Sequence, residues 1–232
     1  MVNISDFIRL EMSKKDVELA LSKAIQNDNV GIDNLRQRFK MVRLDCKIRG
    51  YLGEISLRNW FSKYGITFNQ IDFFDDDLNM DIDMVYNKNG KSYNFEVKTS
   101  LIPDSYKDKS GIVQKADIKI IKRTSSIETV SGDIHIQIYF DFLRKVRDSE
   151  LKSLNQNETD INKIYKNMKL DDYINNTYFV AWIDKPTLIN YINSQYIKTW
   201  TFPYAKKDFW KCPLCSIAKK PIEIIDYINN LK

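Results

Sequence analysis

The alternation of apolar and polar residues divides the chain into a helical first part and a mixed remainder. Apolar residues recur at near-helical spacing over residues 5–27. Further helical stretches cover about 33–49 and about 50–63, as one long helix or as two. Gly65 is expected to close this region, because glycine tolerates the positive φ that is common just after a helix.

From Ile66 onward the spacing changes to the two-residue period of strands. A short strand is predicted at 66–68, and residues 81–87 and 91–99 alternate around Asn89-Gly90, a strong signal for a tight hairpin. Further along, the pattern predicts strands at 133–141 and 177–183 and helices at 142–155, at 159–169 and from Pro186, while 115–123 fits either. This order favours an α/β sandwich built around a mixed sheet.

The composition is that of an ordinary globular chain, with 232 residues, 43% hydrophobic and 29% charged. We expect one domain over 1–232, with an N-terminal helical region over about 1–47, a core over about 48–141 and an α/β extension over about 142–232. No apolar run reaches the length of a membrane span, and the N-terminus lacks a secretory pattern. A cytoplasmic protein with no membrane partner is therefore predicted.

Cysteine and histidine are too few for several kinds of chemistry. Three cysteines do not make a disulfide framework, and a single histidine excludes a multi-histidine metal site. Cys212 and Cys215 have the spacing of half a zinc knuckle, but only Cys46 and His135 remain to complete it, so we do not expect structural zinc. His135 is interpreted as a structural residue of its strand, although its parity with Gln137 leaves a substrate contact open.

The charges are unevenly distributed around a net charge of +5. Residues 71–84 hold six aspartates and no basic residue, whereas 31–49 and 197–220 are rich in lysine and arginine. An acidic segment between basic ones suits a cation site that also attracts a polyanion, although solvated surfaces have the same composition. The candidate DNA-binding residues are Arg36, Arg38, Lys40, Arg43, Lys206 and Lys207.

The predicted hairpin gathers charged residues on one face. With Asn89-Gly90 as a two-residue loop, Asp83 lies opposite Glu96 and Asp81 lies opposite Lys98, all on one side of the hairpin. Opposed carboxylates destabilise a hairpin, but a divalent cation between them makes the arrangement favourable. Lys98 could then hold an attacking water and balance the charge of a phosphate.

These residues resemble the signature of the PD-(D/E)XK nuclease superfamily. Asp83 is followed, 13 positions later, by the acidic residue of the triplet Glu96-Val97-Lys98. The sequence departs from the pattern at Ile82, which stands where the name of the family has proline. Asp81 shares a face with Asp83, so the choice of metal ligand between them stays open, with spacing in favour of Asp83.

A helical glutamate upstream adds to this resemblance. Gly53-Glu54 lies before the first predicted strand, as does the helical glutamate of many members of the superfamily. On a helix, Glu54 shares an apolar face with Tyr51, Leu57 and Phe61. A carboxylate on such a face needs a partner, and a metal-linked site would supply one.

The resemblance implies a restriction-endonuclease-like fold and a nuclease mechanism. Asp83, Glu96 and the Val97 carbonyl would bind Mg²⁺, with Mn²⁺ able to substitute, and Lys98 and Glu54 would complete the catalytic set. Cleavage of double-stranded DNA would leave a 5′-phosphate and a 3′-hydroxyl. The long regions on either side of the core favour a homodimeric type II restriction enzyme. The alternatives are a Holliday junction resolvase, a non-catalytic DNA-binding module and a protein-interaction domain; the number of metal ions stays open.

Overall fold

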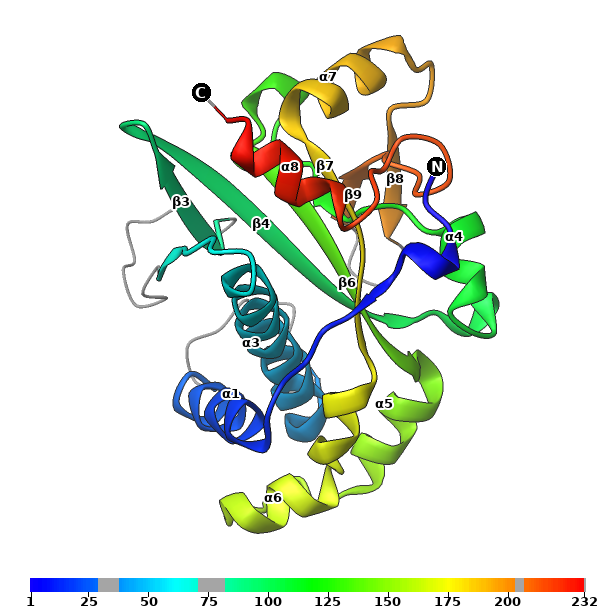
Figure 1. Ribbon diagram of the computed structural model, residues 1–232. Coiled ribbons are helices and arrows are strands. Elements are labelled where there is room, and N and C mark those ends of the chain that lie inside the picture. Colours follow the sequence, from blue (N-terminus) through cyan, green and yellow to red (C-terminus); the bar gives the residue numbers. More distant parts are fainter. Residues whose placement is uncertain (29–37, 71–81, 203–206, 232) are drawn as a thin grey trace.

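The computed structural model describes residues 1–28, 38–70, 82–202 and 207–231. Among these residues, a mixed sheet of six strands runs in the order β1-β7-β6-β4-β3-β2, and a smaller sheet has the order β5-β9-β8. Figure 1 shows the long strands β4 and β6 crossing the centre of the molecule, with helices on either side of them. The predicted α/β class, a mixed sheet flanked by helices, is confirmed.

The elements have the following bounds. The larger sheet contains β1 (Ile8–Arg9), β2 (Asn69–Gln70), β3 (Met84–Lys88), β4 (Lys91–Ile102), β6 (Ile134–Leu143) and β7 (Thr177–Asp184), and the smaller contains β5 (Ile120–Ile121), β8 (Thr199–Phe202) and β9 (Lys207–Trp210). The α-helices are α1 (Lys14–Gln26), α3 (Lys40–Ser62), α4 (Ser110–Lys115), α5 (Arg144–Ser153), α6 (Ile161–Asn167), α7 (Lys185–Ser194) and α8 (Glu223–Asn229). Short 3-10 helices cover Ile4–Asp6, Asp104–Tyr106, Ile127–Thr129 and Leu170–Asn175.

The first helix begins later than its apolar spacing predicts. Ser13 and Asp16 form a capping box that starts α1 at Lys14, so the predicted start at residue 5 is wrong. The preceding Ile8–Arg9 is instead an edge strand, β1, which pairs with β7. Of the two alternatives for the next helical stretch, the continuous one holds for Lys40–Ser62, while residues 33–37 lie outside the described residues. Gly65 has φ +72, as predicted.

The hairpin of β3 and β4 has the predicted turn and register. Asn89 and Gly90 both have positive φ, as a tight two-residue turn requires, and Met84 pairs with Phe95 while Lys88 pairs with Lys91. The predicted start of the first strand at residue 81 is too early, because β3 begins at Met84. Strand β4 then continues to Ile102 in parallel pairing with β6.

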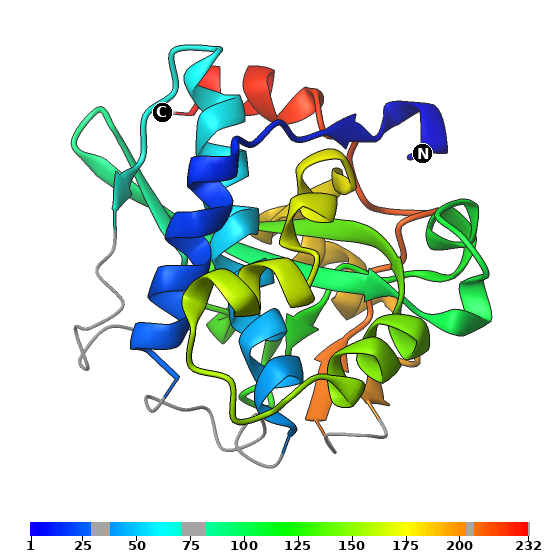
Figure 2. The same ribbon diagram turned by 90° about the horizontal axis from the view of Figure 1, so that it is seen from below.

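Two apolar clusters occupy opposite faces of the larger sheet. One contains Phe95 and Val97 of β4 together with apolar residues of α1, α3 and α8. The other contains Tyr139 of β6 with residues of α7 and β9. Figure 2 shows α1 and α3 side by side across the sheet. Strand β6 is therefore covered on both faces, which explains why its first seven residues are all buried.

Other predictions are confirmed in part. The strand predicted at 66–68 is wrong in position, because β2 covers Asn69–Gln70. The ambiguous stretch 115–123 contains the end of α4 and then β5. Pro186 stands in the first turn of α7, whose N-cap is Asp184. The β8–β9 hairpin has no predicted counterpart; Trp200 and Phe209 stack across it at 4.8 Å. Within the described residues, no helix has the length and apolar character that a bilayer crossing needs.

Candidate functional site

Asp83 lies where β3 separates from β4. Its amide donates to the Phe95 carbonyl at 2.9 Å, and its carboxylate accepts from the Val97 amide at 2.5 Å. Asp83 and Met84 therefore both lie against Phe95, as in a β-bulge, and the predicted direct pairing of Asp83 with Glu96 does not form. The carboxylate instead binds a backbone donor, which removes the direct opposition of two negative charges. Asp81 lies outside the described residues.

Beyond this point, the described residues place no strand beside this edge of β4. The residues of β4 that pair with β3 are Lys91 to Phe95, and within the described residues no strand pairs with that edge further along. The Val97 amide points to this edge, where Asp83 accepts its hydrogen bond. Because the N–H and C=O of one strand residue point to the same side, the Val97 carbonyl faces the same edge.

Glu96 is buried between two nitrogen donors. Its Oε1 lies 2.7 Å from Nζ of Lys98, and its Oε2 lies 2.7 Å from Nδ1 of His135. The parallel register places Glu96 directly beside His135 on β6. Burial opposes ionisation of Glu96, but Lys98 and His135 outweigh it and lower its pKa to about 2. Glu96 is therefore a carboxylate at neutral pH.

Glu54 occupies the other face of the sheet. A Cβ built on the preceding Gly53 would lie 2.5 Å from Cγ2 of Thr99, so α3 passes very close to β4 here. Val97 and Thr99 thus point toward α3, and by alternation Glu96 and Lys98 point away from it. The resemblance implies one catalytic set that contains Glu54 and Glu96, and the two side chains instead lie on opposite faces of β4.

Glu54 is nevertheless coupled to Asp83 by charge and by a shared neighbour. Burial and the negative charge of Asp83 raise the pKa of Glu54 well above its usual value. Arg58, one turn later on α3, lies 4.0 Å from Oε2 of Glu54 and donates to the Asp83 carbonyl at 3.4 Å. The sequence reasoning missed Arg58, although its i, i+4 spacing from Glu54 was a usable signal.

The expected metal ligands have hard oxygen donors, which Mg²⁺ prefers. A carboxylate has about four lone-pair sites, so Glu96 retains acceptor capacity after binding Lys98 and His135. In the part of the chain that the structure describes, no three acidic, histidine or cysteine side chains form a ready-made metal cluster. The donor types of Asp83, Glu96 and the Val97 carbonyl suit a cation that completes its coordination with water or phosphate oxygens, and the two carboxylates lie on either side of the β4 edge that carries this carbonyl.

Three of the predicted DNA-binding residues make internal contacts. Arg43 donates two hydrogen bonds of 2.6 Å to Asp28, and Lys40 donates to the Glu158 carbonyl at 2.7 Å. Arg38 donates to Sγ of Cys46 at 3.2 Å. These contacts join α3 to neighbouring segments of the fold.

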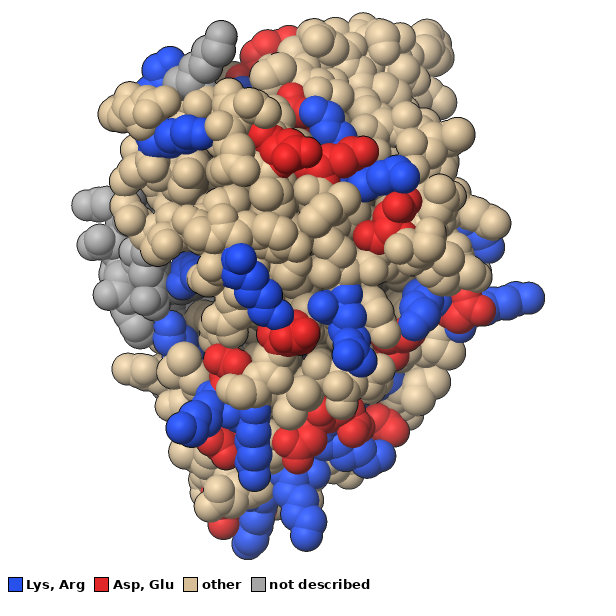
Figure 3. Space-filling model, viewed as in Figure 1, with Lys and Arg blue, Asp and Glu red and all other residues tan. Residues whose placement is uncertain are grey.

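The other predicted DNA-binding residues are separate from this group. Lys207 begins β9 and is half-buried, while Arg36 and Lys206 lie outside the described residues. On the face drawn in Figure 3, basic and acidic side chains are interspersed, with no separate basic band.

A row of polar side chains extends from Glu96 along the same face of β4 and β6. Beyond Lys98, Ser100 accepts hydrogen bonds from Nζ of Lys119 at 2.7 Å and from Gln137 at 3.0 Å. Burial and the charges of Arg144 and Arg49 lower the pKa of Lys119 to about 8. The sequence reasoning missed Ser100 and Lys119, because their pairing joins distant segments.

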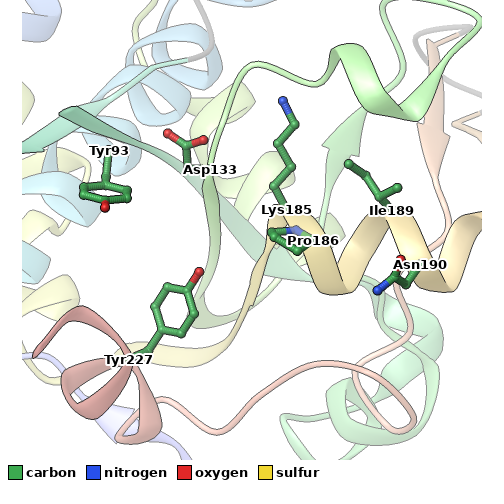
Figure 4. Close-up of a pocket in the computed structure, with 7 residues that line it drawn as sticks. All are labelled: Tyr93, Asp133, Lys185, Pro186, Ile189, Asn190 and Tyr227. Atoms are coloured by element: carbon green, nitrogen blue, oxygen red, sulfur yellow. The ribbon is translucent and has the colours of Figure 1, made fainter. Parts of the chain in front are cut away.

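One pocket lies away from this site. It has a volume of about 370 Å³ and is lined by Tyr93, Asp133, Lys185, Pro186, Ile189, Asn190 and Tyr227 (Figure 4). Asp133 accepts a hydrogen bond from the Asn94 amide, and Lys185 donates one to the Val130 carbonyl.

The two cysteines of the half zinc knuckle differ in exposure, since Cys212 is buried and Cys215 is exposed.

The candidate site is thus the edge of β4, with charged side chains on both faces of the strand and one imidazole among them. Asp83 and Glu54 lie toward α3, and Glu96, Lys98 and His135 lie toward the opposite face. Comparison of the chain with known protein families, with curated proteins and with solved structures finds no match.

Proposed function

We propose that this chain is a Mg²⁺-dependent endonuclease that hydrolyses double-stranded DNA, of the type II restriction class. One observation carries the proposal: Asp83 is bound to the Val97 amide at the edge of β4, beside the ionised Glu96 and its partner Lys98. This hydrogen bond supports the proposal because Val97 lies between Glu96 and Lys98 in the same sequence pattern, although the strand pairing itself ends before Asp83.

The surroundings of Asp83 and Glu54 favour a cation. Burial of Glu54, together with the negative charge of nearby Asp83, raises the pKa of Glu54. Arg58 offsets only part of this charge from 4.0 Å. A divalent cation held by Asp83, Glu96 and the Val97 carbonyl would stabilise the ionised forms of Asp83 and Glu54 by offsetting their negative charges.

The residues would divide the reaction among them. A bound Mg²⁺ would act as a Lewis acid on the scissile phosphate. Lys98, whose ammonium group is partly exposed, would hold the attacking water and balance charge that develops on the phosphate. In-line attack would then leave a 5′-phosphate and a 3′-hydroxyl. A homodimer would match a two-fold symmetric DNA site.

The direct test is digestion of plasmid and phage DNA by the full chain with Mg²⁺, with Mn²⁺ and with a chelator, followed by sequencing of the ends. We expect discrete fragments that depend on the metal. Asp83→Asn and Glu96→Gln should abolish cleavage and keep DNA binding in Ca²⁺, whereas the exposed hairpin variant Asn87→Ala should cut normally.

The outcomes separate the alternatives. Cleavage of branched junctions without sequence preference would identify a resolvase instead of a restriction enzyme. DNA binding without cleavage in either metal would favour the non-catalytic module. A chain that binds neither DNA nor divalent metal would contradict the whole proposal.

A further inference from the structure

His135 is a fully buried histidine that contacts Glu96 through one of its ring nitrogens. It is 1% exposed, and its Nδ1 lies 2.7 Å from Oε2 of Glu96. Its Nε2 is buried and has no hydrogen-bond partner within the described residues. Buried polar atoms are normally paired, and within the described residues the contact with Glu96 is the hydrogen bond that this imidazole makes.

The backbone before β6 closes over this pair. A Cβ built on Gly132 would lie 2.9 Å from Cε1 of His135 and 3.3 Å from Cβ of Glu96. Any side chain at this position would therefore collide with the imidazole ring. The main chain at Gly132 thus contacts both side chains and limits their movement.

We propose that His135 is a positioning residue, which holds Glu96 in the orientation that the nuclease site needs. This inference rests on the proposed function. The terminal torsion of a glutamate is broad, so a carboxylate without an anchor would rotate. The bond from His135 fixes Oε2 and leaves Oε1 on the side of Lys98. Lys98 acts at this carboxylate from the exposed side, and His135 acts from the buried side.

The test compares two substitutions that differ in one hydrogen-bond donor. In His135→Asn the side-chain amide nitrogen replaces Nδ1, whereas His135→Leu keeps apolar volume and removes the donor. Outer hydrogen bonds to metal ligands are typically worth about 10- to 100-fold in metal affinity or activity. We expect His135→Leu to need a correspondingly higher Mg²⁺ concentration for half-maximal cleavage, and His135→Asn to restore most of the wild-type requirement.

Matched controls separate positioning from loss of stability. Phe140→Leu also alters a fully buried side chain of β6 and should lower the melting temperature without changing the Mg²⁺ requirement. If His135→Leu does not fold, His135→Gln takes its place as the variant without a donor at the Nδ1 position. The glutamine side chain is longer, so its amide nitrogen lies beyond that position. A donor-dependent Mg²⁺ requirement supports the proposal, and equal requirements in all three folded proteins overturn it.

A second readout does not depend on cleavage. Because the chain has one histidine, every imidazole signal in a nuclear magnetic resonance spectrum belongs to His135. We expect the ring nitrogen shifts to change on adding Mg²⁺ to the full chain, and this change to be lost in Asp83→Asn. If Mg²⁺ leaves the imidazole signals unchanged in a wild-type chain that cuts DNA, the role of His135 is refuted and the nuclease proposal stands. Signals that respond in a chain that cuts no DNA would support the role of His135 and refute the nuclease proposal.

Discussion

Glu54 and Glu96 are both buried, yet their surroundings move their pKa values in opposite directions. Burial and Asp83 raise the pKa of Glu54, while Lys98 and His135 outweigh burial at Glu96 and lower its pKa to about 2. Divergent pKa values of buried carboxyl groups are common where one group must bind a cation and another must hold or release a proton. At the scale of single residues, these environments are the strongest physical sign of a functional site.

The raised pKa of Glu54 predicts a stability gain on neutralisation. A folded-state pKa above the unfolded value means that the ionised form disfavours folding, so stability rises as pH falls through the folded-state pKa toward the unfolded value. Glu54→Gln should therefore raise the free energy of unfolding at pH 7 and weaken its dependence on pH. Urea titrations at several pH values measure this, with the half-exposed Glu18→Gln as control. A destabilised Glu54→Gln would mean that its ionised carboxylate supports the fold.

Lys98 is predicted to matter for rate and not for folding. Its side chain is 23% exposed and its ion-pair partner Glu96 keeps His135, so removing it exposes little apolar surface. Lys98→Ala should lower kcat by about 10²-fold, the usual contribution of a positioned charge or proton-transfer group. The exposed Lys91→Ala in the same hairpin is the control for rate and melting temperature. An unfolded Lys98→Ala would show that this lysine supports the fold and would contradict the prediction.

At the scale of elements, the site depends on how closely α3 crosses β4. Gly53 provides the contact, because a methyl group there would overlap Cγ2 of Thr99. The hairpin on the other side of the site is set by local chemistry, namely the positive φ of Asn89 and Gly90. Glu54 and Arg58 lie on α3 and Asp83 lies beside the hairpin, so the distance between these two elements sets the distances of Glu54 and Arg58 from Asp83.

Gly53→Ala should push α3 away from β4. Overpacking of this kind typically costs about 1–3 kcal/mol of stability, and here it should also impair cleavage because Glu54 and Arg58 move with the helix. The double variant Gly53→Ala with Thr99→Ser removes the opposing methyl group and should recover part of both losses. Calorimetry and cleavage rates of the four proteins test the coupling. Strictly additive effects would contradict a direct contact.

At the scale of the whole molecule, a buried ion cluster joins segments distant in the sequence. Asp45 of α3 binds Nε of Arg49 at 2.8 Å and Arg147 of α5 at 2.9 Å, and it accepts a hydrogen bond from Tyr173. Desolvation opposes the charge of Asp45, but the two arginines outweigh it and lower its pKa. This cluster anchors α5 and the Leu170–Asn175 turn against α3, beside the sheet that carries the site.

The lowered pKa of Asp45 predicts an acid-dependent loss of stability. A depressed folded-state pKa contributes stability above the unfolded value of about 3.9, and this contribution disappears as pH falls through the folded-state pKa. Asp45→Asn should therefore be less stable at neutral pH, by about 3–5 kcal/mol for a broken buried pair, and should lose less on acidification. Urea titrations between neutral and acidic pH measure both effects. The half-exposed Asp148→Asn is the control.

DNA affinity should depend on basic side chains that are not already bound to acidic or carbonyl groups of the protein itself. The logarithm of affinity should fall linearly with the logarithm of salt concentration, as condensed counterions are released from the DNA. Neutralising Lys207 and Lys211 together should reduce the slope by about 0.9 for each DNA phosphate that these lysines neutralise. Arg43→Ala should chiefly lower stability, because its guanidinium group is bound to Asp28. Filter-binding and melting experiments distinguish the two effects, and the reverse pattern would place the DNA on α3.

Sequence reasoning alone reached the local features of the site. The Asn89-Gly90 turn, the hairpin register, the closure at Gly65 and the burial of Glu54 on an apolar helix face all follow from neighbours within a few residues. Backbone sterics and periodic burial act over such short distances, so they can be read from the chain. The α/β class follows for the same reason, from the order of the elements.

The tertiary structure decided what each charged group meets. It placed Glu54 and Glu96 on opposite faces of β4, gave the Asp83 carboxylate to the Val97 amide, and brought His135 to Glu96 from a strand 39 positions away. It also bound Arg43 to Asp28 and Lys40 to the Glu158 carbonyl. Such pairings depend on which strands become neighbours and how closely a helix crosses them, because desolvation and Coulomb energy arise only when distant segments pack together.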